Sequence, residues 1–239
     1  MGFERSYQTN IPSNLKLEKL DPNFLTGLTD AEGCFSIKIG KRTQLEFNIT
    51  LHSIDDELIK LVHEYFNCGN YRSYANKSVF SVVSIKDMKK IIDHFDNYPL
   101  LTDKQADYLL FREGYINKIN KVRDIEKYLA LSASINWGLS EKLKKEYPNI
   151  IPATRPIIEV NPSIHPMWIS GFVTGDGSFL IRTTMESNKE YIKYIRPAFE
   201  ITQHVRSNKL LNLLKNKFNC GNVVNNSDRC DHYGVYNIT

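Results

Sequence analysis

The sequence predicts an α/β protein of the α+β type, built from two copies of one unit of helix, hairpin, helix and hairpin. One motif occurs twice, at residues 24–35 and 168–179, and each copy has a glycine, a small residue four positions later and a carboxylate before a closing glycine. A second motif, Phe-Asn-Cys-Gly-Asn, occurs at 66–70 and again at 218–222. Alternating apolar and polar residues after the first motif are typical of strands with one buried face. Two copies of one unit predict a pseudo-two-fold molecule whose paired acids meet near the axis.

Local signals predict the elements of the first unit in order. Asp21 can cap a helix with Pro22 at its first position, and Gly33 is expected to end that helix in a left-handed conformation. The following segments are expected to form a hairpin with a turn at 41–43, a helix, a second hairpin and three more helices, in this order: 35–51, 55–66, 70–85, 88–95, 103–118 and 125–134.

The second unit repeats this order only as far as its second hairpin, where 235–239 align with 82–86. Nothing corresponds to the helices between residues 86 and 139. The second motif is displaced by eight residues more than the first, which predicts a longer hairpin around Glu186–Glu190. The chain is therefore divided into an N-terminal arm, a first repeat, a proline-rich linker and an incomplete second repeat: 1–20, 21–143, 144–164 and 165–239.

The missing helices would cover the apolar face of the second sheet. Without them Phe199 and Ile201 are expected to face water, and an exposed apolar patch of that size favours aggregation. We therefore hypothesise that the chain is a fragment, or that the remaining residues lie on a separate segment.

The composition sets broad limits on the function. The net charge of +4 over 239 residues permits a polyanionic partner without requiring one. The four cysteines form no Cys-x-x-Cys pair, so buried free thiols are expected rather than zinc ligands or disulfides. No apolar run is long enough to span a membrane, and the N-terminus resembles neither a secretory signal nor a good transit peptide.

The acids that end the two motifs are the candidate metal ligands. Helix residues four apart share a face, so each motif helix carries a stripe of small residues, Gly27 with Ala31 and Gly171 with Gly175. If the stripes face each other, Glu32 and Asp176 emerge side by side at two helix C-termini, where the helix dipoles and mutual repulsion disfavour both charges. One such acid is more often a solvated helix-end residue. Two at matched positions favour a Mg²⁺ site.

The polar faces of the predicted hairpins are the candidate nucleic-acid surface. Arginine, lysine, asparagine and glutamine on a ribbon can read donors and acceptors in a DNA groove. For one hairpin an ordinary solvated face is the better interpretation, whereas four hairpins beside a carboxylate pair favour readout. The candidates are Ser36, Lys38, Arg42, Gln44, Glu46, Asn48, Asn70, Arg72, Tyr74, Lys77, Arg182, Thr184, Arg196, Glu200, Asn222 and Asn226.

With these motifs the chain resembles the LAGLIDADG homing endonucleases, and most closely the single-chain members encoded in group I introns of fungal mitochondria. The repeated motif matches the two helices that name the family, and further similar segments are 98–108, 135–139 and 168–172. The resemblance covers about residues 22–239.

The resemblance implies two αββαββα repeats, each with a saddle-shaped antiparallel sheet over double-stranded DNA, in a monomer that reads an asymmetric target of about twenty base pairs. It implies that Glu32 and Asp176 bind Mg²⁺, with Mn²⁺ or Ca²⁺ as substitutes in vitro, and that the carbonyls of Ala31 and Gly175 are further ligands. The implied reaction is metal-assisted phosphodiester hydrolysis that breaks both strands and leaves short 3′ overhangs.

The resemblance also suggests supporting residues. Lys104 is the candidate for neutralising charge, and Gln203 for ordering water, although its counterpart in the first repeat is Leu51. Asp30 keeps the family's acid two residues before the metal ligand, whereas Thr174 does not. Two alternatives remain: an RNA maturase that binds intron RNA, and a cleavage-inactive DNA-binding module. The resemblance, the absence of an import signal and the abundance of Asn, Ile, Lys and Tyr favour a protein encoded in the mitochondrion.

Overall fold

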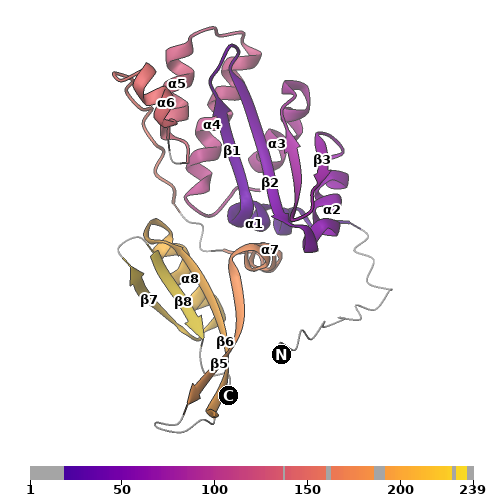
Figure 1. The fold of residues 1–239 in the computed structure, drawn as a ribbon, viewed down its shortest axis with the longest axis vertical. Coiled ribbons are helices and arrows are strands. Elements are labelled where there is room, and N and C mark those ends of the chain that lie inside the picture. The colour runs from indigo at the N-terminus through magenta and orange to yellow at the C-terminus, as the bar shows by residue number, and fades with distance from the viewer. Residues whose placement is uncertain (1–18, 137, 160–162, 186–191, 228–229, 236–239) are drawn as a thin grey trace.

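The computed structural model consists of two four-stranded antiparallel sheets with helices, joined through one pair of helices (Figure 1). This confirms the predicted fold class. The structure describes residues 19–136, 138–159, 163–185, 192–227 and 230–235. Most of the expected arm, part of the linker and the tip of the long hairpin lie outside the described residues.

The first repeat follows the predicted order of elements. Its sheet has the strand order β1-β2-β4-β3. Asp21 caps α1 by accepting from the backbone N–H groups of Asn23 and Phe24, and Pro22 is its first residue. The elements are α1 (Pro22–Glu32), β1 (Gly33–Lys38), β2 (Gln44–His52), η1 (Ser53–Asp55), α2 (Asp56–Phe66), β3 (Asn70–Ser73), β4 (Lys77–Val82), α3 (Ile85–Asn97), α4 (Lys104–Ile119), α5 (Ile125–Ser134) and α6 (Glu141–Glu146).

The second repeat has the same topology, with the strand order β5-β6-β8-β7. Its elements are α7 (Pro166–Asp176), β5 (Gly177–Met185), β6 (Ile192–His204), η2 (Val205–Ser207), α8 (Asn208–Phe218), β7 (Asn222–Ser227) and β8 (Cys230–Val235). β5 and β6 have 9 and 13 residues, against 6 and 9 for β1 and β2, so the first hairpin of this repeat is longer, as predicted.

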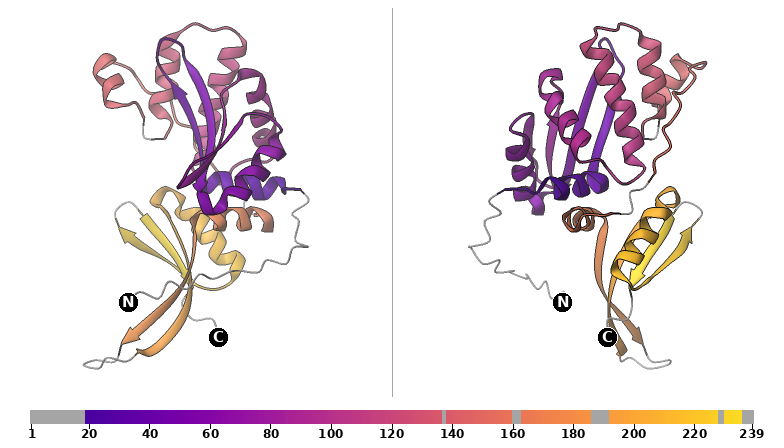
Figure 2. Two further views of the ribbon diagram at one scale, coloured as in Figure 1. Left: turned by 45° about the vertical axis from the view of Figure 1, so that its right-hand side comes forward. Right: turned by 180° about the vertical axis from the view of Figure 1, so that it is seen from behind.

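Helices cover one face of the first sheet and leave the other open. α3, α4 and α5 lie behind the strands in Figure 1 and in front of them when the molecule is seen from behind (Figure 2). The buried ring of Phe35 on β1 contacts Phe47 of the neighbouring strand, Phe95 of α3, and Tyr108 and Phe111 of α4. This aromatic core holds α4, and with it the start of α4 at Lys104, against the sheet.

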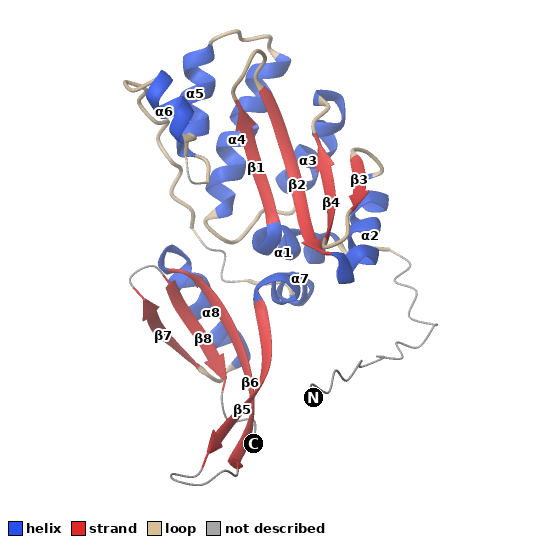
Figure 3. Ribbon diagram, viewed as in Figure 1, coloured by secondary structure: helices blue, strands red, loops and turns tan. Residues whose placement is uncertain are grey.

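The second sheet is covered over only part of its apolar face. The far half of the β5–β6 hairpin extends beyond α8 with no helix against it (Figure 3). Phe179, Ile181 and Ile195 are 79%, 75% and 65% exposed. The prediction that Ile201 faces water is wrong, because Ile201 packs in a fully buried cluster with α7 and α8, and Phe199 is only partly exposed. The uncovered strip therefore lies further out along the hairpin than expected.

Three smaller expectations also need correction. Gly33 is extended (φ −74°, ψ 150°) rather than left-handed, because β1 begins directly at the end of α1. A Cβ at Gly33 would lie 2.4 Å from Cγ2 of Thr29, so the glycine serves a close approach. The four cysteines are free thiols, but none is fully buried and Cys220 is exposed. The expected linker begins inside the short helix α6, which Ser140 caps through the N–H of Leu143.

The described helices are all too short or too polar to cross a membrane.

Candidate active site

The two motif helices, α1 and α7, pack against each other through their glycines. A Cβ on Gly27 would lie 2.0 Å from the carbonyl oxygen of Trp168, and a Cβ on Gly171 would lie 2.0 Å from the carbonyl oxygen of Phe24. The small residues expected to face each other therefore do so, and the two backbones touch. Figure 1 shows the pair at the junction of the two repeats.

This packing brings Glu32 and Asp176 together at the C-terminal ends of α1 and α7. A Cβ on Gly175, the residue before Asp176, would lie 3.3 Å from Oε1 of Glu32. Burial raises the pKa of Asp176 to about 6, and the negative charges of Glu32 and Asp30 act in the same direction. A buried acid beside a second carboxylate forms a site that attracts a cation.

Lys104 of the first repeat binds the backbone beside Glu32, and Gln203 of the second repeat contacts Asp176. The Nζ of Lys104 donates to the carbonyl oxygens of Thr29 at 2.9 Å and of Ala31 at 3.1 Å. Burial lowers the pKa of Lys104, while the charges of Asp30 and Asp176 act against that shift. Gln203 Nε2 donates to Oδ2 of Asp176 at 2.7 Å. Gln203 thus contacts the Asp176 carboxylate directly.

The donor set at the helix ends fits a hard divalent cation. Two carboxylates and the nearby backbone carbonyls of Ala31 and Gly175 supply oxygen ligands only, as Mg²⁺ and Ca²⁺ prefer. Within the described part of the chain, no group of three or more His, Cys, Asp and Glu side chains is placed to hold a metal. A divalent ion here would therefore complete its shell with water or phosphate oxygens. The Ala31 carbonyl already accepts from Lys104 and has a second lone pair for such an ion.

A cleft of about 300 Å³ opens beside these residues. Ala31, Lys104, Asp176 and Gln203 line it, together with residues that the sequence did not single out, among them Arg155 and Arg206. The cleft therefore joins Asp176 to the linker and to η2.

Arg155 of the linker ties the first repeat together at the rim of this cleft. Its guanidinium donates to Oδ1 of Asp107 at 2.5 Å and to Oδ2 of Asp103 at 2.7 Å. Arg206 of the second repeat donates to the same Asp103 oxygen at 3.1 Å. Asp103 directly precedes Lys104, so both arginines hold the start of α4. No local sequence pattern predicts this network, because Arg155 lies 48 residues from Asp107 and 52 residues from Asp103.

The predicted polar residues of the first sheet share its open face. β1 pairs with β2 so that Ser36 faces Glu46 and Lys38 faces Gln44. Asn48 lies opposite Ser81, which is in turn opposite Asn70. Side chains alternate across a strand, so this register puts all of these residues on the same face of the sheet. The same face carries Arg72 and Lys77, and Arg42 and Tyr74 lie in the adjoining turns. It also carries four residues that were not predicted: Cys34, Thr50, Val79 and Ser81.

The second sheet presents a similar open face. Ser178 lies opposite Glu200 and Arg182 opposite Arg196, and Arg182 forms an ion pair with Glu200. Register places Asn222 and two residues that were not predicted on the same face: Thr202 and His232, whose Nδ1 lies 3.0 Å from the Thr202 hydroxyl. Thr184 and Asn226 belong to β5 and β7, but their side chains lie outside the described residues.

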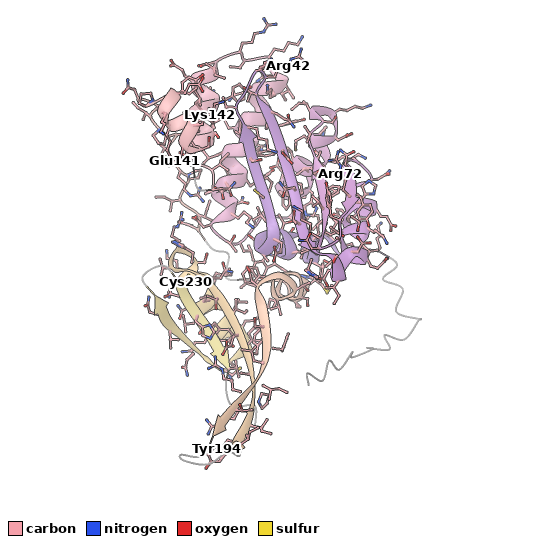
Figure 4. The ribbon with its side chains drawn as sticks, viewed as in Figure 1. Arg42, Arg72, Glu141, Lys142, Tyr194 and Cys230 are labelled. Atoms are coloured by element: carbon pink, nitrogen blue, oxygen red, sulfur yellow. The ribbon has the colours of Figure 1, made fainter. Side chains whose placement is uncertain are left out.

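The two open faces extend to opposite ends of the molecule. Figure 4 shows Arg42 at the outer end of the first hairpin and Tyr194 towards the far end of the third, separated along the longest axis. The ring of Tyr194 lies 5.4 Å from the guanidinium carbon of Arg196. The motif helices α1 and α7 lie between the two repeats (Figure 1).

Comparison with known proteins agrees with this geometry. The family model described as "LAGLIDADG endonuclease" matches residues 25–115 and 169–239. The chain is 36% identical to "Probable intron-encoded endonuclease 3" of Neurospora crassa, over 72% of this chain and 35% of the relative. It is 34% identical to "Probable intron-encoded endonuclease 2" of the same fungus, over 88% of this chain and 51% of the relative. The chain thus spans about a third to a half of the length of these curated relatives.

Solved structures share the whole arrangement. The LAGLIDADG homing endonuclease I-GzeII in complex with its DNA target superposes with a TM-score of 0.82 at 33% identity, over 91% of this chain and 79% of that one. I-SmaMI bound to uncleaved DNA target in the presence of calcium ions superposes with a TM-score of 0.84 at 33% identity, over 92% and 80%. With the family model matching both repeats and the two motif helices meeting through their glycines, this chain belongs to the LAGLIDADG endonuclease family.

Proposed function

We propose that the chain is a site-specific endonuclease that cuts both strands of double-stranded DNA in a Mg²⁺-dependent reaction. The observation that carries the proposal is the placement of Glu32 and Asp176 at two touching helix ends, between two polar sheet faces. Placing two carboxylates side by side at helix C-termini does not stabilise the fold, and burial disfavours the charge of Asp176 there. Relatives described as intron-encoded endonucleases, and neighbours described as DNA complexes, support the same proposal.

The side chains at the site have separate tasks in this reaction. Glu32 and Asp176 would hold the divalent ion, with the carbonyls of Ala31 and Gly175. When bound, such an ion supplies an activated water and stabilises the leaving oxygen of a phosphodiester. Gln203 orients the Asp176 carboxylate through one oxygen and leaves the other open. Lys104 places a positive charge beside Ala31, where a scissile phosphate would bring further negative charge.

The two sheet faces would read the two halves of one asymmetric target of about twenty base pairs. Their polar residues differ between the repeats, so a single chain reads both half-sites and binds its DNA target as a monomer. With one acid assigned to each strand, we propose that cleavage leaves short 3′ overhangs. We also propose that Mn²⁺ substitutes for Mg²⁺ and that Ca²⁺ supports binding. The intron-encoded relatives favour an origin in a fungal mitochondrial genome.

Cleavage of a randomised plasmid library tests the proposal. The full chain is incubated with the library in Mg²⁺ or in Ca²⁺, and the broken ends are sequenced. The expected result in Mg²⁺ is a single class of cleaved site. In Ca²⁺ the protein should bind the same site without cutting it. Glu32→Gln is the control that should bind and not cut. Binding without cleavage by the unaltered chain in Mg²⁺ would identify a DNA-binding module, and selective binding of intron RNA with no DNA cleavage would identify a maturase.

A further inference from the structure

The carboxylate of Asp30 is buried between the two repeats and accepts four hydrogen bonds. Asp30 lies on α1, two residues before Glu32, and is 4% exposed. Its Oδ1 accepts from the backbone N–H of Thr102 at 3.1 Å and from the Thr102 hydroxyl at 2.6 Å. Its Oδ2 accepts from the N–H of Leu101 at 2.8 Å and from the indole N–H of Trp168 at 2.8 Å. All four partners donate, so each oxygen of Asp30 accepts two hydrogen bonds.

Burying this charge has a cost that the helix packing does not require. A carboxylate taken out of water is unfavourable unless hydrogen bonds and opposite charge compensate it. The four bonds from Leu101, Thr102 and Trp168 supply this compensation. An apolar side chain would fill a helix interface without such compensation, which points to a role in positioning its partners.

The partners of Asp30 lead directly to Lys104. The Thr102 hydroxyl, which donates to Asp30, accepts from the backbone N–H of Lys104 at 3.1 Å. The Lys104 ammonium then returns to α1 and donates to the carbonyls of Thr29 and Ala31, on either side of Asp30. The segment 101–104 is therefore held against the last turn of α1 at both ends. Leu101 and Thr102 bind Asp30, and Lys104 binds the carbonyls of Thr29 and Ala31.

The indole of Trp168 extends this contact to the other repeat. Trp168 is buried in α7, the helix that ends at Asp176, and its ring stacks on Phe172. The position of α7 that matches Asp30 holds Thr174, which is exposed and donates to the carbonyl of Ser170 in its own helix. The connection is therefore one-sided, and a single carboxylate joins α1, α7 and the segment that carries Lys104.

We propose that Asp30 is a positioning residue of the active site, which holds Lys104 over the Ala31 carbonyl and fixes α7 beside it through Trp168. This inference rests on the proposed function. In Asp30→Asn the amide must present its NH₂ to one pair of donors, so either the Thr102 bonds or the Leu101 and Trp168 bonds are lost. Thr102→Val removes the hydroxyl between Asp30 and Lys104, and Thr102→Ser keeps it.

The test separates positioning from folding with three measurements on the full-length chain. Single-turnover cleavage and DNA affinity in Ca²⁺ are measured on the site that the unaltered chain selects from the randomised library. Hydrogen exchange by NMR, on the protein alone, follows the indole proton of Trp168 and the amide protons of Leu101 and Thr102. Thr174→Ala is the matched control at the other helix.

Asp30→Asn and Thr102→Val are expected to lower the single-turnover rate at least tenfold, with DNA affinity within about threefold. Thr102→Ser should restore most of the rate, Thr174→Ala should change neither quantity, and the Leu101 or Trp168 protons should exchange faster in Asp30→Asn. Unchanged cleavage in both variants, or parallel loss of rate, affinity and thermal stability, overturns the positioning role. If the unaltered chain cuts no DNA, the proposed function fails, and unchanged exchange in Asp30→Asn then separately overturns the contact.

Discussion

A Cβ on Gly27 would lie only 2.0 Å from the carbonyl oxygen of Trp168, because α1 and α7 pack backbone to backbone. Gly27→Ala is therefore expected to destabilise the chain by about 3 kcal/mol or more, because the clash is with main chain and cannot be relieved by a rotamer. In an unobstructed helix the same change would stabilise. Urea denaturation measures the difference. Gly40→Ala is the control, since nothing lies within 4 Å of its Cβ, and it should stay within about 1 kcal/mol of the unaltered chain. Equal stabilities for the two variants would contradict the helix contact.

Removing either candidate metal acid should abolish cleavage without removing DNA binding. Glu32→Gln and Asp176→Asn keep the shape of each side chain and lose the charge that holds a cation. We expect no detectable cleavage and an affinity for the selected DNA site within about threefold of the unaltered chain. Gel-based cleavage in Mg²⁺ and fluorescence anisotropy in Ca²⁺ measure the two quantities. The site assignment is wrong if both variants still cut at the rate of the unaltered chain.

The linker arginine should contribute more to stability than a surface ion pair. Arg155→Met leaves Asp107, whose side chain is 9% exposed, without its positive partner. We expect a loss of about 2 kcal/mol, because an uncompensated and largely buried charge remains. Lys89→Met breaks the exposed pair with Asp93 and should cost less than about 1 kcal/mol. Chemical denaturation of both variants makes the comparison, and a similar small loss in each would show that the linker contact is dispensable.

His94 should make the fold less stable in mild acid. Burial lowers the pKa of His94 to about 3, against 6.5 for the free side chain. The folded state therefore binds this proton less readily than the unfolded state. Stability is lost as the pH falls below 6.5, by about 1.4 kcal/mol per pH unit from this group. Unfolding free energies measured between pH 4 and 8 should fall less steeply in His94→Gln, and identical slopes in the two proteins would contradict the assignment.

The uncovered strip on the second sheet should cause self-association. Phe179, Ile181 and Ile195 are apolar and exposed on one face of the β5–β6 hairpin. In the first repeat the matching Phe35 and Ile37 are buried. We expect concentration-dependent association of the isolated chain in sedimentation, reduced by Ile181→Lys and unaffected by Ile54→Lys, a solitary exposed isoleucine. A chain that stays monomeric at all concentrations with nothing bound would contradict this expectation.

Local patterns predicted most of the architecture and the centre of the site. The alternation around Phe35 and Phe47 predicted a sheet with one buried face, and the paired glycines allowed α1 and α7 to approach closely. The burial of Ile201 could not be predicted, because it depends on how far α8 and α7 reach across the second sheet. The extended backbone at Gly33 likewise follows from the immediate start of β1.

The sequence could not predict the Arg155 network or the four hydrogen bonds to Asp30, for a different reason. The partners of each are far apart in the chain, at separations of 48 to 52 residues for the Arg155 ion pairs and 71 to 138 residues for the Asp30 bonds. They meet only through tertiary packing. The family resemblance suggested Lys104 as a site residue. Its hydrogen bonds to the Thr29 and Ala31 carbonyls could be seen only in the structure.

The indole of Trp168 makes the association of the two halves directional. The glycine contacts are reciprocal, so either motif helix could dock equally well on a second copy of itself. In a pair of first halves, however, Asp30 would meet Phe24, the counterpart of Trp168, and one of its buried oxygens would have no indole donor. One hydrogen bond thus penalises a pairing of two first halves and favours the pairing of a first half with a second half.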